Sequence, residues 1–241
     1  MTDAAAAQAG GPTFADLRRY YRSRLAMSRA IVVLPEHGCV YVKNQKAGCS
    51  TMTLWLDRVH TGEHDFMTQR VHRDNRLPKP KDVGWPEVVR MLAGGAFRFS
   101  FVREPLARAR STWYAKVVRQ QHYRAGLQEV LGLPVDPESP LTFEQFVTAI
   151  EQQDPLTEMD PHWRPQHVNL LHPLVDYDHI GRLESFDADL AVIREHAGLP
   201  DVPVTIPNSR KDGQPDPYAG RPDLVRRVEA LYAQDFELYG Y

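Results

Sequence analysis

The sequence predicts an α/β fold in which a central parallel sheet is flanked by helices. Two short apolar segments of strand character, at residues 39–43 and 97–102, each run into an amphipathic helix, and polar residues follow the end of each strand. Parallel strands joined by helices indicate a doubly wound α/β domain, whose ligands bind at the carboxyl ends of the strands. A chain of 241 residues, 42% hydrophobic and 25% charged, suffices for one such domain.

The chain begins with a segment that we expect to be disordered. Residues 1–12 are small and polar, whereas residues 13–241 are predicted to form a single domain. Within that domain, residues 14–26 are expected to form a short helix ahead of the core.

The first predicted strand, residues 39–43, leads through a polar turn into a helix. The strand is short and rich in β-branched residues, which is typical of a buried strand. Ser50 or Thr51 is available as the N-cap of the helix. Its apolar face carries Met52, Trp55, Leu56 and Val59.

Residues 61–96 show no clear pattern and are predicted to be irregular. Their basic cluster at 69–81 is interpreted either as a solvated loop or as a surface that binds an anionic acceptor. The second strand, residues 97–102, then runs into a helix with Pro105 in its first turn. The apolar stripe of that helix carries Leu106, Ala109, Trp113 and Val117.

The second half of the chain continues the alternation of strands and helices. Ser185 is expected to cap a helix that has an acidic first turn and ends at Gly198. The last helix is expected to pack Leu224, Val228, Leu231 and Tyr232. The predicted elements are a helix at 141–150, a loop at 160–167, a strand at 177–184, a helix at 185–197, a loop at 200–222 and a helix at 221–241.

Composition argues against several classes of protein. A formal net charge of −2 gives no general attraction to nucleic acid or to membranes, so any anion site must be local. Cys39 and Cys49 are too few for a disulfide framework and are interpreted as free thiols of a reducing compartment. The sequence shows no targeting segment and no long apolar run, which predicts a cytoplasmic protein without a membrane span.

Four later histidines do not make a zinc signature. Their spacings of five, five and seven residues, without a paired cysteine, argue against a tetrahedral site. We interpret them as surface or hydrogen-bonded side chains and predict no metal site. They are His162, His167, His172 and His179.

The turn after the first strand is a candidate anion-binding loop. Small residues after Lys46 would let a phosphate approach the free N–H groups at the start of the helix, and Lys46 could neutralise its charge. Ser50 and Thr51 could add hydroxyl donors. Read alone, the segment is equally consistent with a polar turn that caps a helix. The candidate binding residues are Lys46, Ala47, Gly48, Cys49, Ser50 and Thr51.

Three other kinds of phosphate site do not fit this loop. A magnesium-dependent P-loop kinase places its lysine after the glycine, whereas here Cys49 follows Gly48. A cysteine phosphatase needs an arginine six residues after its nucleophile, where this chain has Trp55. The G-x-G-x-x-G motif of dinucleotide-binding proteins is absent.

Arg103 and Ser111 form a second candidate anion site. Arg103 ends the second strand, and Ser111 lies eight residues later in the following helix. The guanidinium could bind a phosphate bidentately while the Ser111 hydroxyl donates a further hydrogen bond. Alone, Arg103 would more often be a structural arginine, but its pairing with the first loop favours a ligand with anionic groups at two separated places.

These two segments resemble the signature elements of the sulfotransferases that use 3′-phosphoadenosine 5′-phosphosulfate (PAPS), specifically carbohydrate sulfotransferase family 2. The segments are KNQKAGCSTM at 43–52 and FSFVREPLARARSTWY at 99–114. Later blocks resemble that family in the same order, at 160–173, 177–190 and 231–241. The resemblance covers nearly everything from residue 38 onward and implies a P-loop NTPase-like sulfotransferase fold.

The resemblance also implies roles for the binding residues. The first loop would bind the 5′-phosphosulfate, with Lys46 at the phosphate oxygen from which sulfur departs, and Arg103 and Ser111 would bind the 3′-phosphate. Arg210 and Lys211 lie in a segment similar to a late basic loop of soluble sulfotransferases and are secondary candidates for that phosphate.

The implied reaction moves a sulfuryl group to a hydroxyl of a carbohydrate or glycoconjugate by in-line displacement without a metal. Because the chain has neither the membrane anchor nor the disulfides of the animal members, a soluble, bacterial-type enzyme is expected.

Transfer to a hydroxyl also needs a base close to the acceptor oxygen. Related enzymes place it between the two phosphate motifs, and His72 is favoured here because basic residues that could hold an anionic acceptor flank it. The other candidates are His60, Glu63 and His64. His162 and Trp163 resemble the acceptor side of the family, and the Trp163 ring would either stack on a sugar or lie in the core.

Two other functions remain open on these residues. One is a nucleotide-binding or partner-binding module without catalysis on the same fold, and the other is a P-loop small-molecule kinase. Catalysis would require both Lys46 and a base. A kinase would bind ATP with magnesium better than 3′-phosphoadenosine 5′-phosphate (PAP).

Overall fold

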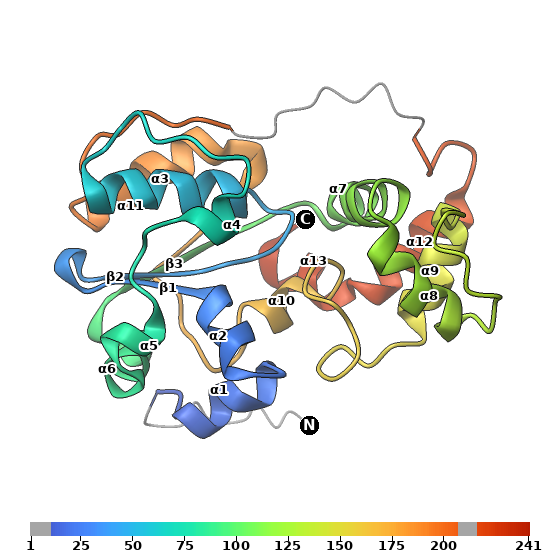
Figure 1. The fold of residues 1–241 in the computed structure, drawn as a ribbon, viewed down its shortest axis with the longest axis horizontal. Coiled ribbons are helices and arrows are strands. Elements are labelled where there is room, and N and C mark those ends of the chain that lie inside the picture. The colour runs from blue at the N-terminus through green and yellow to red at the C-terminus, as the bar shows by residue number, and fades with distance from the viewer. Residues whose placement is uncertain (1–10, 207–215) are drawn as a thin grey trace.

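A sheet of four strands, in the order β1-β2-β3-β4, forms the centre of the molecule (Figure 1). The structure is a computed structural model that describes residues 11–206 and 216–241. β1 pairs with β2 antiparallel, whereas β2 with β3 and β3 with β4 run parallel. The strands are β1 (Ile31–Leu34), β2 (Cys39–Val42), β3 (Phe97–Val102) and β4 (His179–Arg182). The sheet is mixed but mainly parallel, which confirms the predicted α/β class.

The helices of the described residues follow in chain order. They are α1 (Phe14–Tyr20), α2 (Arg24–Ala30), α3 (Cys49–Thr61), α4 (Val71–Asp74), α5 (Pro80–Val83), α6 (Trp85–Arg90), α7 (Pro105–Thr112), α8 (Arg124–Val130), α9 (Phe143–Glu151), α10 (Gln166–Asn169), α11 (Phe186–His196), α12 (Pro222–Leu231) and α13 (Ala233–Tyr239). Short 3₁₀ turns lie at Pro35–His37, Gln121–Tyr123 and Leu183–Ser185, and π-helical segments extend α6 and α7 over Met91–Gly95 and Trp113–Val118.

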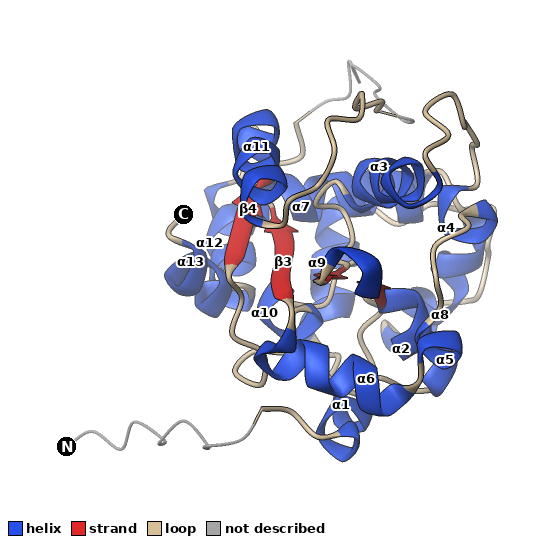
Figure 2. Ribbon diagram, turned by 90° about the vertical axis from the view of Figure 1, so that its left-hand side faces the viewer, coloured by secondary structure: helices blue, strands red, loops and turns tan. Residues whose placement is uncertain are grey.

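Helices cover both faces of the sheet. α3 and α11 lie on one face, and α1, α2, α5 and α6 lie on the other (Figures 1 and 2). In β2, Cys39 and Tyr41 belong to the core under α3 and α11, whereas Val40 and Val42 belong to the core on the opposite face. Since successive side chains of a strand alternate between faces, burial of all four requires helices on both sides.

A separate group of helices stands at one end of the sheet. α7, α8, α9 and α12 surround a third core that includes Phe146, Ile150 and Val228, and β3 leads directly into α7 (Figure 1). Because β2 and β3 are parallel, the loop that follows β2 and the start of α7 lie at the same end of the sheet, next to this helical group.

The strand predictions hold best where the local pattern is strong. β3 has the predicted bounds, and β2 is one residue shorter than expected. β1 was not predicted, although three of its four residues, Ile31 to Val33, are β-branched and the strand is wholly buried. The strands lie in chain order, so the sheet lacks the order reversal of a doubly wound fold.

Several helix predictions need correction. Residues 61–96 are not irregular but contain α4, α5 and α6, each too short to leave a periodic pattern in the sequence. The helix expected at 14–26 is divided, because the Ser23 hydroxyl accepts from the Ala26 N–H at 3.1 Å and starts α2. The Ser185 side chain makes no cap on α11 and donates instead to Asp189.

The C-terminal helix is also divided in two. α12 ends before Tyr232, whose hydroxyl donates to the Trp163 carbonyl at 2.6 Å, and α13 starts at the next residue. Leu224, Val228 and Tyr232 are buried as expected, and Leu231 packs against the same core while remaining partly exposed.

Candidate functional site

Residues 43–48, which join β2 to α3, form a fixed turn that we call the anion loop. Asn44 is wholly buried, and its Nδ2 donates to the Phe101 carbonyl at 3.0 Å and to Gln166 Oε1 at 2.8 Å. Lys46 has a φ of 69°, in the left-handed region that residues other than glycine rarely adopt. Such backbone persists only where the surroundings determine it, and it is common at ligand-binding turns.

Gly48 is required at the junction of the anion loop and α3. Its φ is 78°, and a Cβ there would lie 3.1 Å from Leu183 Cδ1. Gly48 is also the N-cap of α3, which begins at Cys49 without a side-chain cap. The expected capping by Ser50 or Thr51 is therefore wrong. The N–H groups of the first helical turn remain available for an anion, as predicted for such a cradle.

The structure brings the two predicted anion elements together. Nη1 of Arg103 donates to the carbonyl oxygen of Lys46 at 3.4 Å, and the Arg103 backbone N–H donates to Gln166 Oε1 at 3.0 Å. Lys46 and Arg103 are both partly exposed. One ligand lying across this contact would meet a cation from each element.

Positive charges converge on Lys46. Burial, opposed by the charge of Cys49 and assisted by the charges of Lys116, Arg103 and Arg108, lowers the pKa of Lys46 to about 8. Burial likewise lowers the pKa of Lys43 to about 8. In the described part of the chain, neither ammonium group has a hydrogen-bonded or ion-paired acidic partner. A polyanionic ligand would supply the missing negative charge.

Arg108 is a structural part of the site that the sequence did not reveal. Its side chain is 1% exposed, and Nε donates to the Gln45 carbonyl at 3.0 Å. Nη2 donates to the carbonyl oxygens of Pro161 and Arg164, at 3.2 and 2.9 Å. Arg108 is the second arginine of the segment REPLAR, which could have marked it as a candidate for the site. The fold is needed to show which carbonyl groups its side chain joins.

The segment after β3 is shaped by its own sequence. Glu104 is the N-cap of α7, and its carboxylate accepts from the N–H groups of Leu106 and Ala107. Pro105 takes the first helical position as predicted. Ser111 lies in the last turn of α7 and is partly exposed. Its role at a second phosphate stays a prediction. Arg210 and Lys211 lie outside the described residues.

Of the four candidate bases between the two motifs, His72 lies against the first turn of α3, directly after the anion loop. Its Nε2 is 3.0 Å from Ser50 Oγ and 3.6 Å from Cys49 Sγ. His60 lies in the last turn of α3, a helix of 13 residues and so about 20 Å long, and Glu63 and His64 follow the end of that helix. There Nδ1 of His60 contacts Glu36 at 2.6 Å, Glu63 pairs with Arg76, and His64 is exposed.

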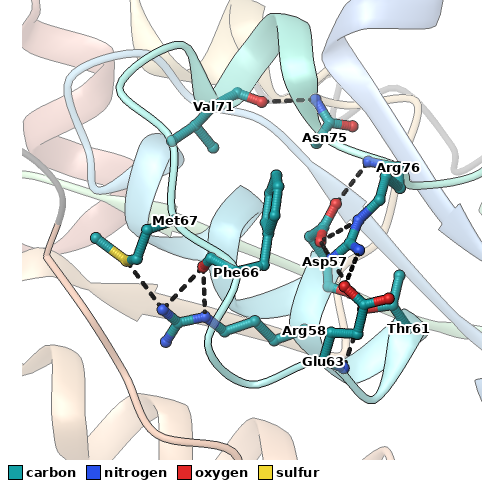
Figure 3. Close-up of polar contacts among 9 residues, drawn as sticks. All are labelled: Asp57, Arg58, Thr61, Glu63, Phe66, Met67, Val71, Asn75 and Arg76. Carbon is teal, nitrogen blue, oxygen red and sulfur yellow. Dashed lines mark hydrogen bonds and ion pairs between the residues drawn. The ribbon is translucent and has the colours of Figure 1, made fainter.

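A buried ion pair holds α4, and with it His72, against α3 (Figure 3). Asp57 is wholly buried and accepts from the Arg76 backbone N–H at 2.5 Å, from Nε at 3.1 Å and from Nη2 at 2.6 Å. Arg76 also pairs with Glu63, which is exposed. On the other side of α3, Arg58 donates to the Phe66 carbonyl. Asp57 and Arg58 thus both hold the segment between α3 and Arg76 against α3.

Cys49 and Cys39 differ sharply in their surroundings. Burial alone would raise the pKa of Cys49, but the hydrogen bond and charge of His72, with the charge of Lys43, bring it down to about 7. Burial raises the pKa of Cys39 to about 12, assisted by the charge of Glu36. Both are free thiols, as predicted. Cys49 is therefore the thiol with substantial thiolate character near neutral pH.

Iodoacetamide at pH 8 is accordingly expected to alkylate Cys49 and to leave Cys39 unmodified. Cys49 also keeps 9% exposure against 1% for Cys39. The labelling rate should rise with pH around a midpoint near the Cys49 pKa of about 7. Peptide mass spectrometry measures both sites, and Cys49→Ser serves as the control. Equal labelling of the two cysteines would contradict the assignment.

His162 lies beside the anion loop, but Trp163 does not offer a free ring. His162 is partly exposed, and the charge of Lys46 contributes to its electrostatics. Trp163 is 5% exposed, donates to Gln153 and packs edge-on against Tyr123 and Phe146. The Trp163 ring is a core aromatic, so the prediction that it stacks on a sugar is not supported.

Other features of the described residues do not add to this site. No group of three or more His, Cys, Asp or Glu side chains at 11–206 and 216–241 could hold a metal ion. Within the same ranges, no helix has the length and apolarity to cross a membrane. A cavity of about 340 Å³ beside β4 is lined by Val102, His172, Arg182 and Tyr239 among others, and none of the candidate residues lines it.

Comparisons with known proteins point in one direction. The chain matches the profile of a family described as "Sulfotransferase family" over residues 29–241. It is 30% identical to carbohydrate sulfotransferase 14 of Danio rerio over 238 residues, covering 90% of this chain and 64% of that protein. It is 29% identical to carbohydrate sulfotransferase 14 of Homo sapiens over 236 residues, covering 90% of this chain and 61% of that protein.

A more distant relative is carbohydrate sulfotransferase 12 of Xenopus laevis, which is 28% identical over 171 residues, or 60% of this chain and 40% of that protein. The chain spans less than two thirds of the length of these relatives. No solved structure gives a significant match.

Proposed function

This chain belongs to the sulfotransferase family, and on that basis we propose that it transfers a sulfuryl group from PAPS to a hydroxyl of a carbohydrate. The observation that carries the proposal is the contact of 3.4 Å between Arg103 Nη1 and the Lys46 carbonyl oxygen. It joins the two anion elements into one site, which supports a ligand that carries anionic groups at two positions. The named relatives support a carbohydrate as the class of acceptor.

Each cation has a distinct part in this proposal. The N–H groups at the start of α3 hold the 5′-phosphate, and Ser50 and Thr51 line the same turn. Lys46 stabilises the negative charge that develops on the phosphate oxygen as the sulfur leaves it. Arg103 and Ser111 bind the 3′-phosphate, and Arg210 and Lys211 remain secondary candidates for it.

The charge around Lys46 fits a donor of this kind. Four cationic side chains influence one another there, and burial disfavours the charged form of Lys46 in the absence of an anion. Binding of a polyanion removes that penalty. Protein cations at these positions could neutralise the donor charge without a metal ion. Cytoplasmic localisation remains a prediction from the sequence.

The test is the affinity for PAP, measured by calorimetric titration of wild type and Arg103→Ala. We expect wild type to bind PAP and Arg103→Ala to bind at least about tenfold more weakly, since a hydrogen bond to a charged group contributes about 1.5–3 kcal/mol. Arg90→Ala is the control, because Arg90 is 59% exposed and pairs with Glu87 on the surface. The control should bind PAP as wild type does.

Three results would oppose the proposal in different ways. Equal affinity of wild type and Arg103→Ala for PAP would remove Arg103 from the donor site. Tighter binding of ATP with magnesium than of PAP would favour a kinase. Turnover is followed as release of PAP from PAPS, with p-nitrophenyl glycosides as acceptors or, where none reacts, with water. Absence of both PAP binding and PAP release would reject the sulfotransferase function itself.

A further inference from the structure

Gln166 is the first residue of α10, and its side chain joins the two anion elements. The residue is wholly buried. Its Oε1 accepts from Asn44 Nδ2, in the anion loop, at 2.8 Å and from the Arg103 backbone N–H at 3.0 Å. Its Nε2 donates to the Arg103 carbonyl oxygen at 2.8 Å. One side-chain amide thus bonds both the loop that follows β2 and the residue that follows β3.

The Gln166 amide holds the backbone of Arg103 as a neighbouring strand would. β3 ends at Val102, so the sheet stops one residue before Arg103. By pairing with both the N–H and the C=O of Arg103, the amide supplies the two bonds that a paired residue of an antiparallel strand would supply. The direction of a side chain follows from its backbone. This pairing therefore directs the Arg103 guanidinium.

A buried carboxylate of the C-terminal helix fixes Gln166 itself. Asp235 of α13 is wholly buried, and its Oδ2 accepts the Gln166 backbone N–H at 2.7 Å. Its Oδ1 accepts the His167 backbone N–H at 2.9 Å. These bonds satisfy N–H groups that the start of a helix leaves unpaired. Because the carboxylate comes from a different helix, the position of Gln166 does not depend on the anion loop.

The direct contact between the two anion elements does not fix their spacing by itself. Arg103 Nη1 lies 3.4 Å from the Lys46 carbonyl oxygen, beyond the usual N–H···O range of about 2.7–3.2 Å. The three bonds of the Gln166 amide are 2.8–3.0 Å long and buried, and a hydrogen bond is stronger away from water. The amide is therefore the main link between Arg103 and the loop that carries Lys46.

We propose that Gln166 is a positioning residue that sets the spacing between the 5′-phosphate cradle and Arg103, and thereby the preference for a donor that carries a 3′-phosphate. The two phosphates of PAPS belong to one nucleoside, so both are bound well only where the two protein elements are preorganised at the matching distance. Without the amide, the ligand itself must order Arg103, and the 3′-phosphate contributes less to affinity. The proposal rests on the proposed sulfotransferase function.

The test compares the affinities for PAP and for adenosine 5′-monophosphate (AMP), which lacks the 3′-phosphate. Calorimetry gives both constants, and the Kd for AMP divided by the Kd for PAP measures what the 3′-phosphate contributes. Gln166→Met keeps the length of the side chain without its amide and is expected to lower that ratio about fivefold or more, as for one or two lost hydrogen bonds. The Kd for AMP should stay within about threefold of wild type, because the N–H groups of α3 remain.

Gln128 provides a matched control. Its buried side chain in α8 pairs with the carbonyl and the N–H of one loop residue, Asp136, at 2.8 and 2.9 Å, as Gln166 does with Arg103. Gln128→Met should therefore lose a similar amount of stability in urea denaturation and keep the wild-type ratio of the two Kd values. An equal fall of that ratio in both variants would show a general loss of stability and overturn the proposal.

A double variant shows whether Gln166 acts through Arg103. In Arg103→Ala the ratio is already lowered, and addition of Gln166→Met should lower it no further, because both changes remove the same interaction. A further fall as large as the one in the wild-type background would show that Gln166 acts independently of Arg103 and would overturn the proposal.

A shorter amide covers the case in which Gln166→Met does not fold. Gln166→Asn keeps the amide but is one methylene shorter, so it cannot span Asn44 and Arg103 together and should also lower the ratio. An unchanged ratio in whichever variant folds would overturn the proposal, and normal PAP binding in that protein would leave the sulfotransferase function standing. Failure of wild type to bind PAP would instead count against the proposed function.

Discussion

Lys46→Ala is expected to lower kcat by about 10²–10³-fold, the usual effect of removing one preorganised donor from a developing negative charge. The Kd for PAP should rise much less, by about tenfold or less, because the N–H groups of α3 and the Arg103 side chain still hold the nucleotide. The loss falls on kcat because Lys46 acts where negative charge grows during the reaction. PAP release gives kcat, and calorimetry gives the Kd.

Two further variants sharpen the Lys46 experiment. Lys81→Ala changes an exposed lysine of α5 and should match wild type in both measurements. Lys46→Arg keeps the charge but replaces a compact ammonium with a planar group, so it should recover only part of the rate. A kcat for Lys46→Ala within threefold of wild type would show that another group stabilises the leaving phosphate.

Asp57→Asn is expected to lower the free energy of unfolding by about 3 kcal/mol. Asp57 is wholly buried and pairs with Arg76, and its replacement leaves the partly buried Arg76 charge with the exposed Glu63 as its acidic partner. The lower end of the usual range applies because the Arg76 side chain is 33% exposed. Urea denaturation followed by tryptophan fluorescence measures the change.

Glu63→Gln provides a matched control on the same arginine. Glu63 also pairs with Arg76, but its side chain is 68% exposed, so its loss should cost less than about 1 kcal/mol. Similar losses in the two variants would show that burial of Asp57 does not determine the strength of the pair. Because α4 carries His72, Asp57→Asn should also weaken the contact between His72 Nε2 and Ser50 Oγ at the start of α3.

Local sequence patterns predicted the elements that are long or strongly periodic. The aromatic and β-branched residues of 97–102 predicted β3. The apolar face of Met52, Trp55 and Leu56 predicted α3, and these three side chains are buried. β1 was missed because four apolar residues directly after a helix give no signal of their own. α4, α5 and α6 were missed because helices of four to six residues depend on tertiary contacts.

The sequence also predicted the anion elements better than the rest of the site. Lys46 and Arg103 each lie in a short segment whose sequence pattern predicts an anion site. In the fold, Arg103 donates a hydrogen bond to the Lys46 carbonyl oxygen. The role of Arg108 could not be predicted, because its hydrogen bonds reach segments more than fifty residues away. The structure places His72 at the start of α3, whereas Glu63 and His64 lie beyond the other end of that helix, and the choice of His72 as base stays a prediction.

The dependence of the anion loop on distant partners bears on how the protein is made. Asn44 needs Gln166, and Gly48 rests against Leu183 and Phe186. A nascent chain that has emerged from the ribosome only as far as β3 lacks these partners, although β2 and α3 are already complete. The anion loop therefore reaches its final shape late in translation, and we expect a free N-terminal half to contain the loop sequence without that shape.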